Sequence, residues 1–185
     1  MNAIILASQS PRRKQLLEWA EVPFEIMVKP TEETYPEGLT AEDVSVHIAR
    51  EKAKAVQTAV PGRIILAADT IVVLGDEIIG KPKDREDAVK ILSRLSGSTH
   101  RVITGVVLTE GKKEIVFADI TEVDFHSLTQ DQISFYVDKY QPYDKAGAYA
   151  IQEWIGVVGI RSVRGDFYNV MGLPVSRVVQ ALKKF

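Results

Sequence analysis

The sequence predicts an α/β protein in which a sheet is flanked by helices, with a smaller region carrying some of the middle strands. Short apolar runs, typical of buried strands, alternate with segments whose apolar residues recur every three or four positions, as in amphipathic helices. Side chains that cap helices open several of those segments. With 185 residues, 45% of them hydrophobic, the chain is long enough to build one domain with a substantial core.

The first element is a buried strand over Ala3–Ala7 that runs directly into a helix. Ser10 fits the N-cap of this helix, and Pro11 fits its first turn, where a missing N–H costs nothing. Because the first backbone N–H groups of a helix have no partner within it, a junction of this kind is a natural anion site.

The charge of this first turn is unusual. Arg12, Arg13 and Lys14 lie where the helix dipole favours acidic side chains and disfavours cations. We interpret these cations, together with the hydroxyls of Ser8 and Ser10, as a site that binds a polyanion. The alternative is a solvated basic turn at the surface.

A strand over Phe24–Val28 is predicted next, followed by a polar loop that ends near Gly38. The loop carries the adjacent carboxylates Glu32 and Glu33. They are either solvated or ligands of a metal or water, and the second interpretation requires the loop to fold back over the Arg12–Arg13 turn.

A long helix is predicted from a capping residue, Thr40, to about Val60. Lys52 falls on its inward-facing stripe, which otherwise contains apolar residues: Val44, Ile48, Ala55 and Ala59. The lysine either extends to the edge of the core or directs its ammonium into a cleft as a charge for phosphate. The cationic first turn favours the cleft.

The strongest buried-strand signal covers Arg63–Leu74, and Asp69 interrupts it. A buried carboxylate costs several kcal/mol unless it is paired or hydrogen-bonded. Asp69 could therefore cap backbone donors at a strand bend, or act as a general base or metal ligand. We favour the functional interpretation, because charges within cores tend to mark sites.

Gly75–Asp76 predicts a hairpin turn, after which Lys81 lies in a Gly-Lys-Pro sequence. The spacing from Gly75 to Lys81 matches a phosphate-binding P-loop. However, Pro82 stands where that motif needs a hydroxyl for magnesium, so we reject the P-loop. Lys81 is either a cation presented by a rigid turn or a solvated loop lysine.

The remaining chain predicts alternating elements and one loop rich in small residues. We expect a helix after Asp84, paired strands over 99–108 and 114–125, a helix after Thr129, a hairpin of 156–163 with 166–170, and a last helix from Val175. In the loop over 140–152, Gln152 offers a donor and an acceptor to a base edge. His47, His100 and His126 lack a second ligand at metal-binding spacing, which favours structural roles.

The composition excludes several classes of function. A formal net charge of −2 argues against general binding to nucleic acid or membrane surfaces. The absence of cysteine excludes disulfides, thiolate zinc sites and thiol nucleophiles. The apolar N-terminal run is too short for a signal peptide or membrane span, so we expect a cytoplasmic protein.

Several of these segments together resemble the Maf family of nucleotide pyrophosphatases, which are structurally akin to inosine-triphosphate pyrophosphatases and known in bacteria from septum-formation inhibition. The resemblance spans nearly the whole chain. It is carried by the segments 8–13 (SQSPRR), 50–53 (REKA), 68–70 (ADT), 80–82 (GKP), 96–100 (SGSTH), 144–152 (DKAGAYAIQ) and 169–174 (NVMGLP).

The resemblance implies an elongated mixed sheet with helices on its sides and two lobes around a central cleft. It also implies a single Maf-like domain over residues 1–185, with a smaller lobe from the middle of the chain, dependence on Mg²⁺ or Mn²⁺, and a homodimer. Thr70 and Gln152, together with Arg12, are similar to the branch of the family that acts on dTTP and UTP.

The residues and the resemblance combine into one hypothesis for substrate binding. The phosphates of a nucleoside triphosphate lie against the Ser8–Arg13 turn, Lys52 and Lys81. A divalent metal bridges phosphate oxygens and a carboxylate, for which Glu33 is the candidate and its neighbour Glu32 the alternative.

The same hypothesis assigns the chemistry. Asp69 activates water for attack on the α-phosphorus, and Arg12, Thr70 and Gln152 select the base. The substrate is dTTP, UTP or a modified pyrimidine triphosphate, in a house-cleaning role, and no nucleic acid or membrane partner is expected. The alternative is a non-catalytic nucleotide-binding regulator of cell division, a septum formation inhibitor.

Overall fold

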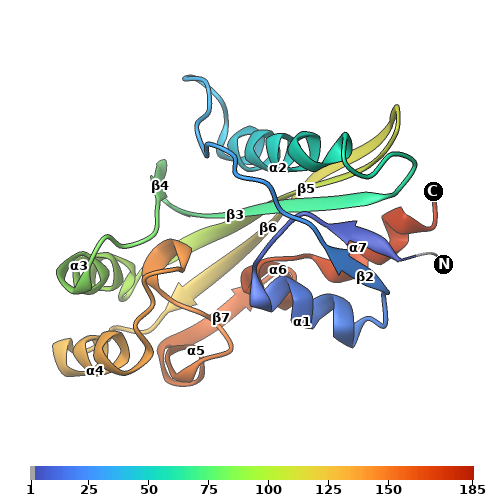
Figure 1. Ribbon diagram of the computed structural model, residues 1–185. Helices are drawn as coiled ribbons and strands as arrows, with labels where there is room; N and C mark the ends of the chain where they lie inside the picture. Colours follow the sequence, from blue (N-terminus) through green and yellow to red (C-terminus); the bar gives the residue numbers. More distant parts are fainter. Residues whose placement is uncertain (1–2) are drawn as a thin grey trace. The chain divides into compact units, whose positions relative to one another are not determined.

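The computed structural model describes residues 3–185 and alternates strands with helices, as the sequence predicts (Figure 1). The strands are β1 (Ile4–Leu6), β2 (Phe24–Ile26), β3 (Ile65–Leu74), β4 (Glu77–Ile79), β5 (Thr99–Glu110), β6 (Lys113–Phe125) and β7 (Ile160–Arg164). The helices are α1 (Pro11–Trp19), α2 (Ala41–Gln57), α3 (Arg85–Leu95), α4 (Gln130–Tyr140), α5 (Trp154–Gly159), α6 (Phe167–Met171) and α7 (Val175–Leu182), with a 3₁₀ turn η1 (Ala146–Ala148).

The strands form one mixed sheet in the order β2-β1-β3-β5-β6-β7, with β4 paired to β3. β1 is parallel to both β2 and β3, whereas the pairs β3–β4 and β6–β7 are antiparallel. The predicted α/β class is therefore confirmed. Within residues 3–185, no helix is both long and apolar enough to cross a membrane.

The chain divides into two compact units. Unit 1 comprises the described residues up to Thr70, together with Thr104–Asp119 and Gly172–Phe185. Unit 2 comprises Ile71–Ile103 and Ile120–Met171, and so comes from the middle of the chain.

In unit 1, α2 packs on one face of the strands and α1 lies on their other side (Figure 1). Alternate strand residues, including Ile5 of β1 with Ile65 and Ala67 of β3, form a buried cluster with α2. Because side chains alternate across a strand, Ile4 and Leu6 face the other side, where α1 buries Leu16 and Leu17. The sheet of unit 1 is consequently apolar on both faces.

The buried face of α2 differs in phase from the predicted stripe, and the helix ends at Gln57 rather than near Val60. It packs through Ala49, Ala53 and Val56, whereas Ala59 is exposed. Small residues let the helix approach the sheet closely. A Cβ placed on Gly105 of β5 would come within 2.3 Å of the Ser45 carbonyl carbon.

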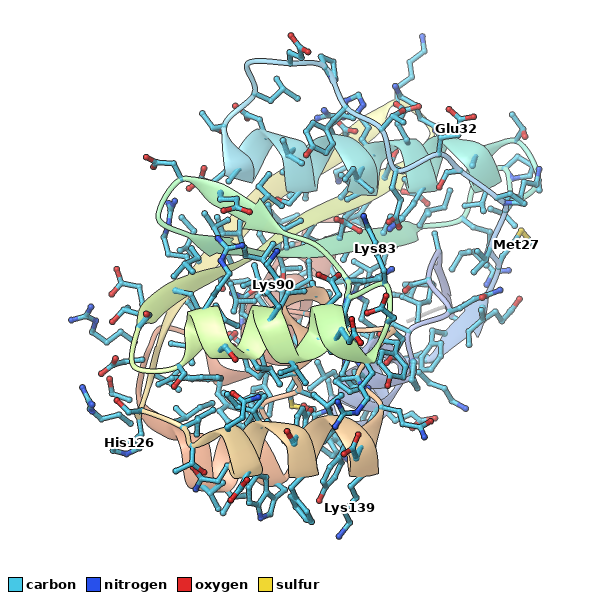
Figure 2. All side chains as sticks on the ribbon, turned by 90° about the vertical axis from the view of Figure 1, so that its left-hand side faces the viewer. Met27, Glu32, Lys83, Lys90, His126 and Lys139 are labelled. Atoms are coloured by element: carbon cyan, nitrogen blue, oxygen red, sulfur yellow. The ribbon has the colours of Figure 1, made fainter. Side chains whose placement is uncertain are left out.

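In unit 2, α3 and α4 lie side by side (Figures 1 and 2). Both predicted N-caps are confirmed: the side chain of Asp84 accepts from the Asp87 N–H, and Thr129 forms a reciprocal capping box with Gln132. Figure 2 shows Lys139 directed away from α3, which leaves the inner side of α4 to apolar packing.

The predicted hairpin of 156–163 with 166–170 is wrong. Residues Trp154–Gly159 and Phe167–Met171 are helical, and the intervening strand β7 pairs with β6 instead. The glycines of this segment have other reasons to be glycine. A Cβ on Gly156 would fall 1.7 Å from the carbonyl oxygen of Ile151, one turn earlier, and Gly165 has a φ of 126° where it passes Thr121 of β6.

Candidate active site

The turn between β1 and α1 forms as predicted. The Ser10 hydroxyl accepts from the Arg13 N–H at 3.5 Å, which makes Ser10 the N-cap, with Pro11 in the first turn. The Ser10 N–H in turn donates to the Ser8 hydroxyl at 3.2 Å. No acidic residue occupies the first turn of α1, so the positive end of its dipole is not neutralised locally.

Arg13 is buried and holds three parts of unit 1 together. Its guanidinium donates to the Gly172 carbonyl at 2.7 Å, to the Ser8 hydroxyl at 3.1 Å and to the Thr70 hydroxyl at 2.9 Å. Burial lowers the pKa of Arg13, and the nearby carboxylate of Asp69 opposes this shift. The sequence did not suggest a buried arginine, because a first-turn cation normally faces solvent.

Asp69 and Thr70 are adjacent on β3, and strand geometry sends their side chains to opposite faces. Thr70 faces Arg13, and its hydroxyl also lies 2.9 Å from the Thr104 hydroxyl. Asp69 faces α2, because it shares the phase of Ala67 in the α2 cluster. One strand thus supplies a polar group to each side.

On the α2 face, the Lys52 ammonium lies between two carboxylates. Its Nζ is 2.6 Å from Asp69 Oδ1 and 2.8 Å from Glu33 Oε1. The Lys52 and Asp69 side chains are only 18% and 12% exposed, whereas Glu33 is 50% exposed. The loop therefore brings Glu33, rather than its neighbour Glu32, to the buried Lys52–Asp69 pair on the α2 face.

Glu32 lines a different feature. It faces a groove of about 590 Å³ between the loop and the outer side of α2, with Thr31, Thr34, His47, Glu51, Lys54 and Ala55. The two adjacent carboxylates therefore have separate surroundings, and the groove does not include Lys52 or Asp69.

The donor set beside Lys52 suits a hard divalent cation. Two carboxylate oxygens, from Glu33 and Asp69, converge on one positive group. No cluster of three or more His, Cys, Asp or Glu side chains able to hold a metal occurs among residues 3–185. Mg²⁺ often uses one or two carboxylates and completes its shell with water and substrate phosphates, so this pair fits it.

Lys81 and Gln152 belong to unit 2 and are both exposed. Gly75 lies in the β3–β4 turn with a φ of 62°, and strand β4 lies between this glycine and Lys81. The segment is therefore a hairpin and not a P-loop. The Gly147 N–H donates to the Gly80 carbonyl at 3.1 Å. The Lys81 turn and the loop that carries Gln152 are therefore neighbours within unit 2.

Buried tyrosines fasten the loop that carries Gln152. The Tyr149 hydroxyl lies 2.6 Å from His100 Nε2, which confirms a structural histidine. The Tyr136 hydroxyl accepts from the Ala150 N–H at 3.1 Å and donates to the Glu153 carboxylate. The sequence reveals neither tyrosine contact, because both join residues from different elements.

His100 also packs edge-on against the rings of Phe125 and Tyr149. Burial lowers its pKa from the usual histidine value of 6.5 to about 4, and the charge of Asp124 only partly opposes this shift. Its Nδ1 has no hydrogen-bond partner. His100 is therefore neutral near pH 7 and acts as a packing and hydrogen-bonding group.

Comparison with known proteins identifies relatives over almost the whole chain. The family profile described as Maf-like protein matches residues 3–185. A dTTP/UTP pyrophosphatase of Cytophaga hutchinsonii is 50% identical over 181 residues, covering 98% of this chain and 83% of that protein. Proteins of the same name from Phocaeicola vulgatus and Bacteroides thetaiotaomicron are 49% and 46% identical, each covering 98% of this chain and 95% of the relative.

The fold also has a solved counterpart. The Ham1 protein of Staphylococcus aureus aligns with a TM-score of 0.52, covering 99% of this chain and 98% of that one. At 18% sequence identity this likeness concerns the fold alone.

Proposed function

This chain belongs to the family of Maf-like proteins, and we propose that it is a pyrophosphatase that converts dTTP and UTP to their monophosphates and pyrophosphate. The observation that carries this proposal is the buried Asp69 carboxylate, held by Lys52 on the side of β3 that Glu33 covers. The names of the relatives supply the substrate class. Modified pyrimidine triphosphates are a further candidate substrate.

Asp69 acts as the general base in this proposal. The Asp69 oxygen that does not face Lys52 and Glu33 takes a proton from a water that attacks the α-phosphorus. The bond from the α-phosphorus to the oxygen that bridges it to the β-phosphorus breaks, and pyrophosphate leaves. Phosphoryl chemistry of this kind is catalysed mainly by positioning and by neutralising charge. Lys52 supplies a positive charge beside Asp69 that can pass to the phosphates, and the positive end of the α1 dipole, which no acidic side chain in its first turn offsets, favours phosphate oxygens.

Glu33 and Asp69 are the residues that would hold a divalent metal, Mg²⁺ or Mn²⁺. When bound, such an ion neutralises charge on the phosphate oxygens. The oxygen-only character of this pair supports the assignment, because hard cations prefer oxygen ligands.

We assign the remaining predicted residues to substrate binding. Arg12, Thr70 and Gln152 select the pyrimidine, and Lys81 neutralises phosphate charge. Ser8, Ser10 and Arg13 shape the turn against which the phosphates lie, since their side chains bond to one another or to the turn. A cytoplasmic homodimer is the proposed form of the protein, and size-exclusion chromatography with light scattering tests its oligomeric state.

The decisive experiment replaces Asp69 by Asn and measures release of pyrophosphate from dTTP and UTP. We expect turnover to fall by about 10²–10⁴-fold, the usual contribution of a general base, while nucleotide binding persists. Asp76→Asn, in the exposed β3–β4 turn, is the matched control and should keep full activity. Undiminished turnover by Asp69→Asn would remove the general-base role.

A non-catalytic regulator of cell division is the less favoured alternative, because the relatives reported above are named as enzymes. Such a regulator would bind nucleotide without releasing pyrophosphate under any condition. Assays with Mg²⁺, with Mn²⁺ and with a chelator separate the two functions, since the enzyme should lose activity only in the chelator.

A further inference from the structure

The Lys52 ammonium occupies the point at which the carboxylates of Glu33 and Asp69 converge, at 2.8 Å and 2.6 Å. A divalent cation coordinated by the same two oxygens needs that point, because Mg²⁺–oxygen distances are only about 2.0–2.1 Å. The ammonium and the ion cannot both remain there, since they would compete for oxygens and repel each other. Lys52 must move before the pair can accept a metal.

We propose that Lys52 is a placeholder for the metal: it closes the Glu33–Asp69 pair in the resting protein and releases it when nucleotide arrives. This inference rests on the proposed function, because the phosphates of the nucleotide provide the new partner for the ammonium. Lys52 thereby makes metal binding depend on substrate. Without nucleotide the pair is occupied, and with nucleotide it is available.

The surroundings of Lys52 allow a movement of this kind. Its backbone is fixed, because the neighbouring Ala49 and Ala53 are buried against the sheet in unit 1. Its side chain is a flexible four-carbon stem that can carry the ammonium to a different acceptor without moving the helix. Glu33 is half exposed on a loop, so the pair can open towards solvent.

A purely structural role for Lys52 makes a different prediction. A lysine that only neutralises a buried aspartate stabilises the fold, and its removal leaves Asp69 unpaired. A lysine with that role alone stays on Asp69 whether or not nucleotide is bound, so nucleotide would strengthen metal binding equally in the wild type and in a variant that lacks Lys52. The two roles therefore differ in how far Lys52 changes the effect of nucleotide on metal affinity, and not simply in stability or activity.

The test is a Mn²⁺ titration followed by electron paramagnetic resonance, first without nucleotide. We expect Lys52→Gln to bind Mn²⁺ on the order of tenfold more tightly than the wild type, since a competing charge has been removed. Lys54→Gln is the matched control. This lysine lies on the exposed side of the same helix and pairs with Glu51 at 2.8 Å, so its removal should leave Mn²⁺ binding unchanged.

Two further measurements assign the effect to the site. The gain in Lys52→Gln should disappear in the double variant Lys52→Gln/Glu33→Gln, because the second change removes a ligand. In the wild type, a non-hydrolysable dTTP analogue should strengthen Mn²⁺ binding, and Lys52→Gln should show a smaller strengthening.

Unchanged or weaker Mn²⁺ binding by folded Lys52→Gln, or a gain that survives Glu33→Gln, would overturn the placeholder role. The placeholder role would also be overturned if the dTTP analogue strengthened Mn²⁺ binding equally in Lys52→Gln and in the wild type. The titration without nucleotide does not depend on turnover. A protein that hydrolyses no triphosphate but shows both the gain in Lys52→Gln and the smaller strengthening by nucleotide would refute the proposed hydrolysis and retain the exchange of Lys52 for metal.

Discussion

The buried His100 should make the stability of the protein sensitive to mild acid. Its pKa is about 4 in the folded protein and 6.5 when exposed in the unfolded chain. As the pH falls through 6.5, the unfolded chain takes up a proton that the folded protein does not, so folding loses stability progressively until about pH 4. One pKa unit corresponds to about 1.4 kcal/mol, so this residue should cost about 2 kcal/mol between pH 7.5 and pH 5.0.

Urea unfolding at pH 7.5 and pH 5.0 measures this loss in two variants. His100→Phe and Tyr149→Phe each break the bond between these side chains, but only His100→Phe removes the titrating group. The loss of unfolding free energy on acidification should be about 2 kcal/mol smaller in His100→Phe than in Tyr149→Phe. Carboxylates and the remaining histidines contribute equally to the loss of unfolding free energy in the two variants, so the difference between the variants reports on His100. Equal losses in the two variants would refute the argument that burial depresses the pKa of His100.

Two further predictions concern unit 1. Gly105→Ala should lower the unfolding free energy by about 1–3 kcal/mol, because the new methyl group meets the α2 backbone at Ser45. Gly80→Ala, which has open space around it, should stay within about 0.5 kcal/mol of the wild type by the same denaturant titration. Arg13→Lys should cost about 1–3 kcal/mol and weaken pyrimidine selection, because a lysine cannot serve Gly172, Ser8 and Thr70 together. Arg50→Lys, at an exposed pair with Glu114, should cost less than about 1 kcal/mol, and a comparable loss in both arginine variants would contradict this reasoning.

The elements that the sequence predicted well depend on local chemistry. The N-caps Ser10, Thr40, Asp84 and Thr129 each accept from a backbone N–H three residues later, so the information lies within one turn. The structure after residue 155, where the predicted hairpin does not form, depends on partners that are distant in the sequence. Strand β7 forms because β6 offers an antiparallel edge, and no local pattern encodes that choice.

The same distinction applies to the candidate site. Asp69 and Lys52 were recognisable because a charge interrupts an apolar pattern, and the structure pairs them with each other. The role of Arg13 was not recognisable, because its acceptor at Gly172 is 159 residues away along the chain. Sequence patterns thus identify which residues are unusual, whereas the partners that decide their roles come from the tertiary fold.

The shortness of β1 explains how one substrate could reach groups on both faces of β3. β1 lies between β2 and β3 and is parallel to both, so the strand order reverses at β1. In open α/β sheets, ligands bind beyond the carboxyl end of the strand at such a reversal. The described ladder between β1 and β3 extends only to Leu6 and Leu66, and β3 continues to Asp69 and beyond. Between the end of that ladder and Val72, where β4 begins to pair with β3, the Ser8–Arg13 turn reaches β3 through the hydrogen bond from Arg13 to Thr70, so a ligand bound in this interval would meet the Asp69 side and the Thr70 side at once.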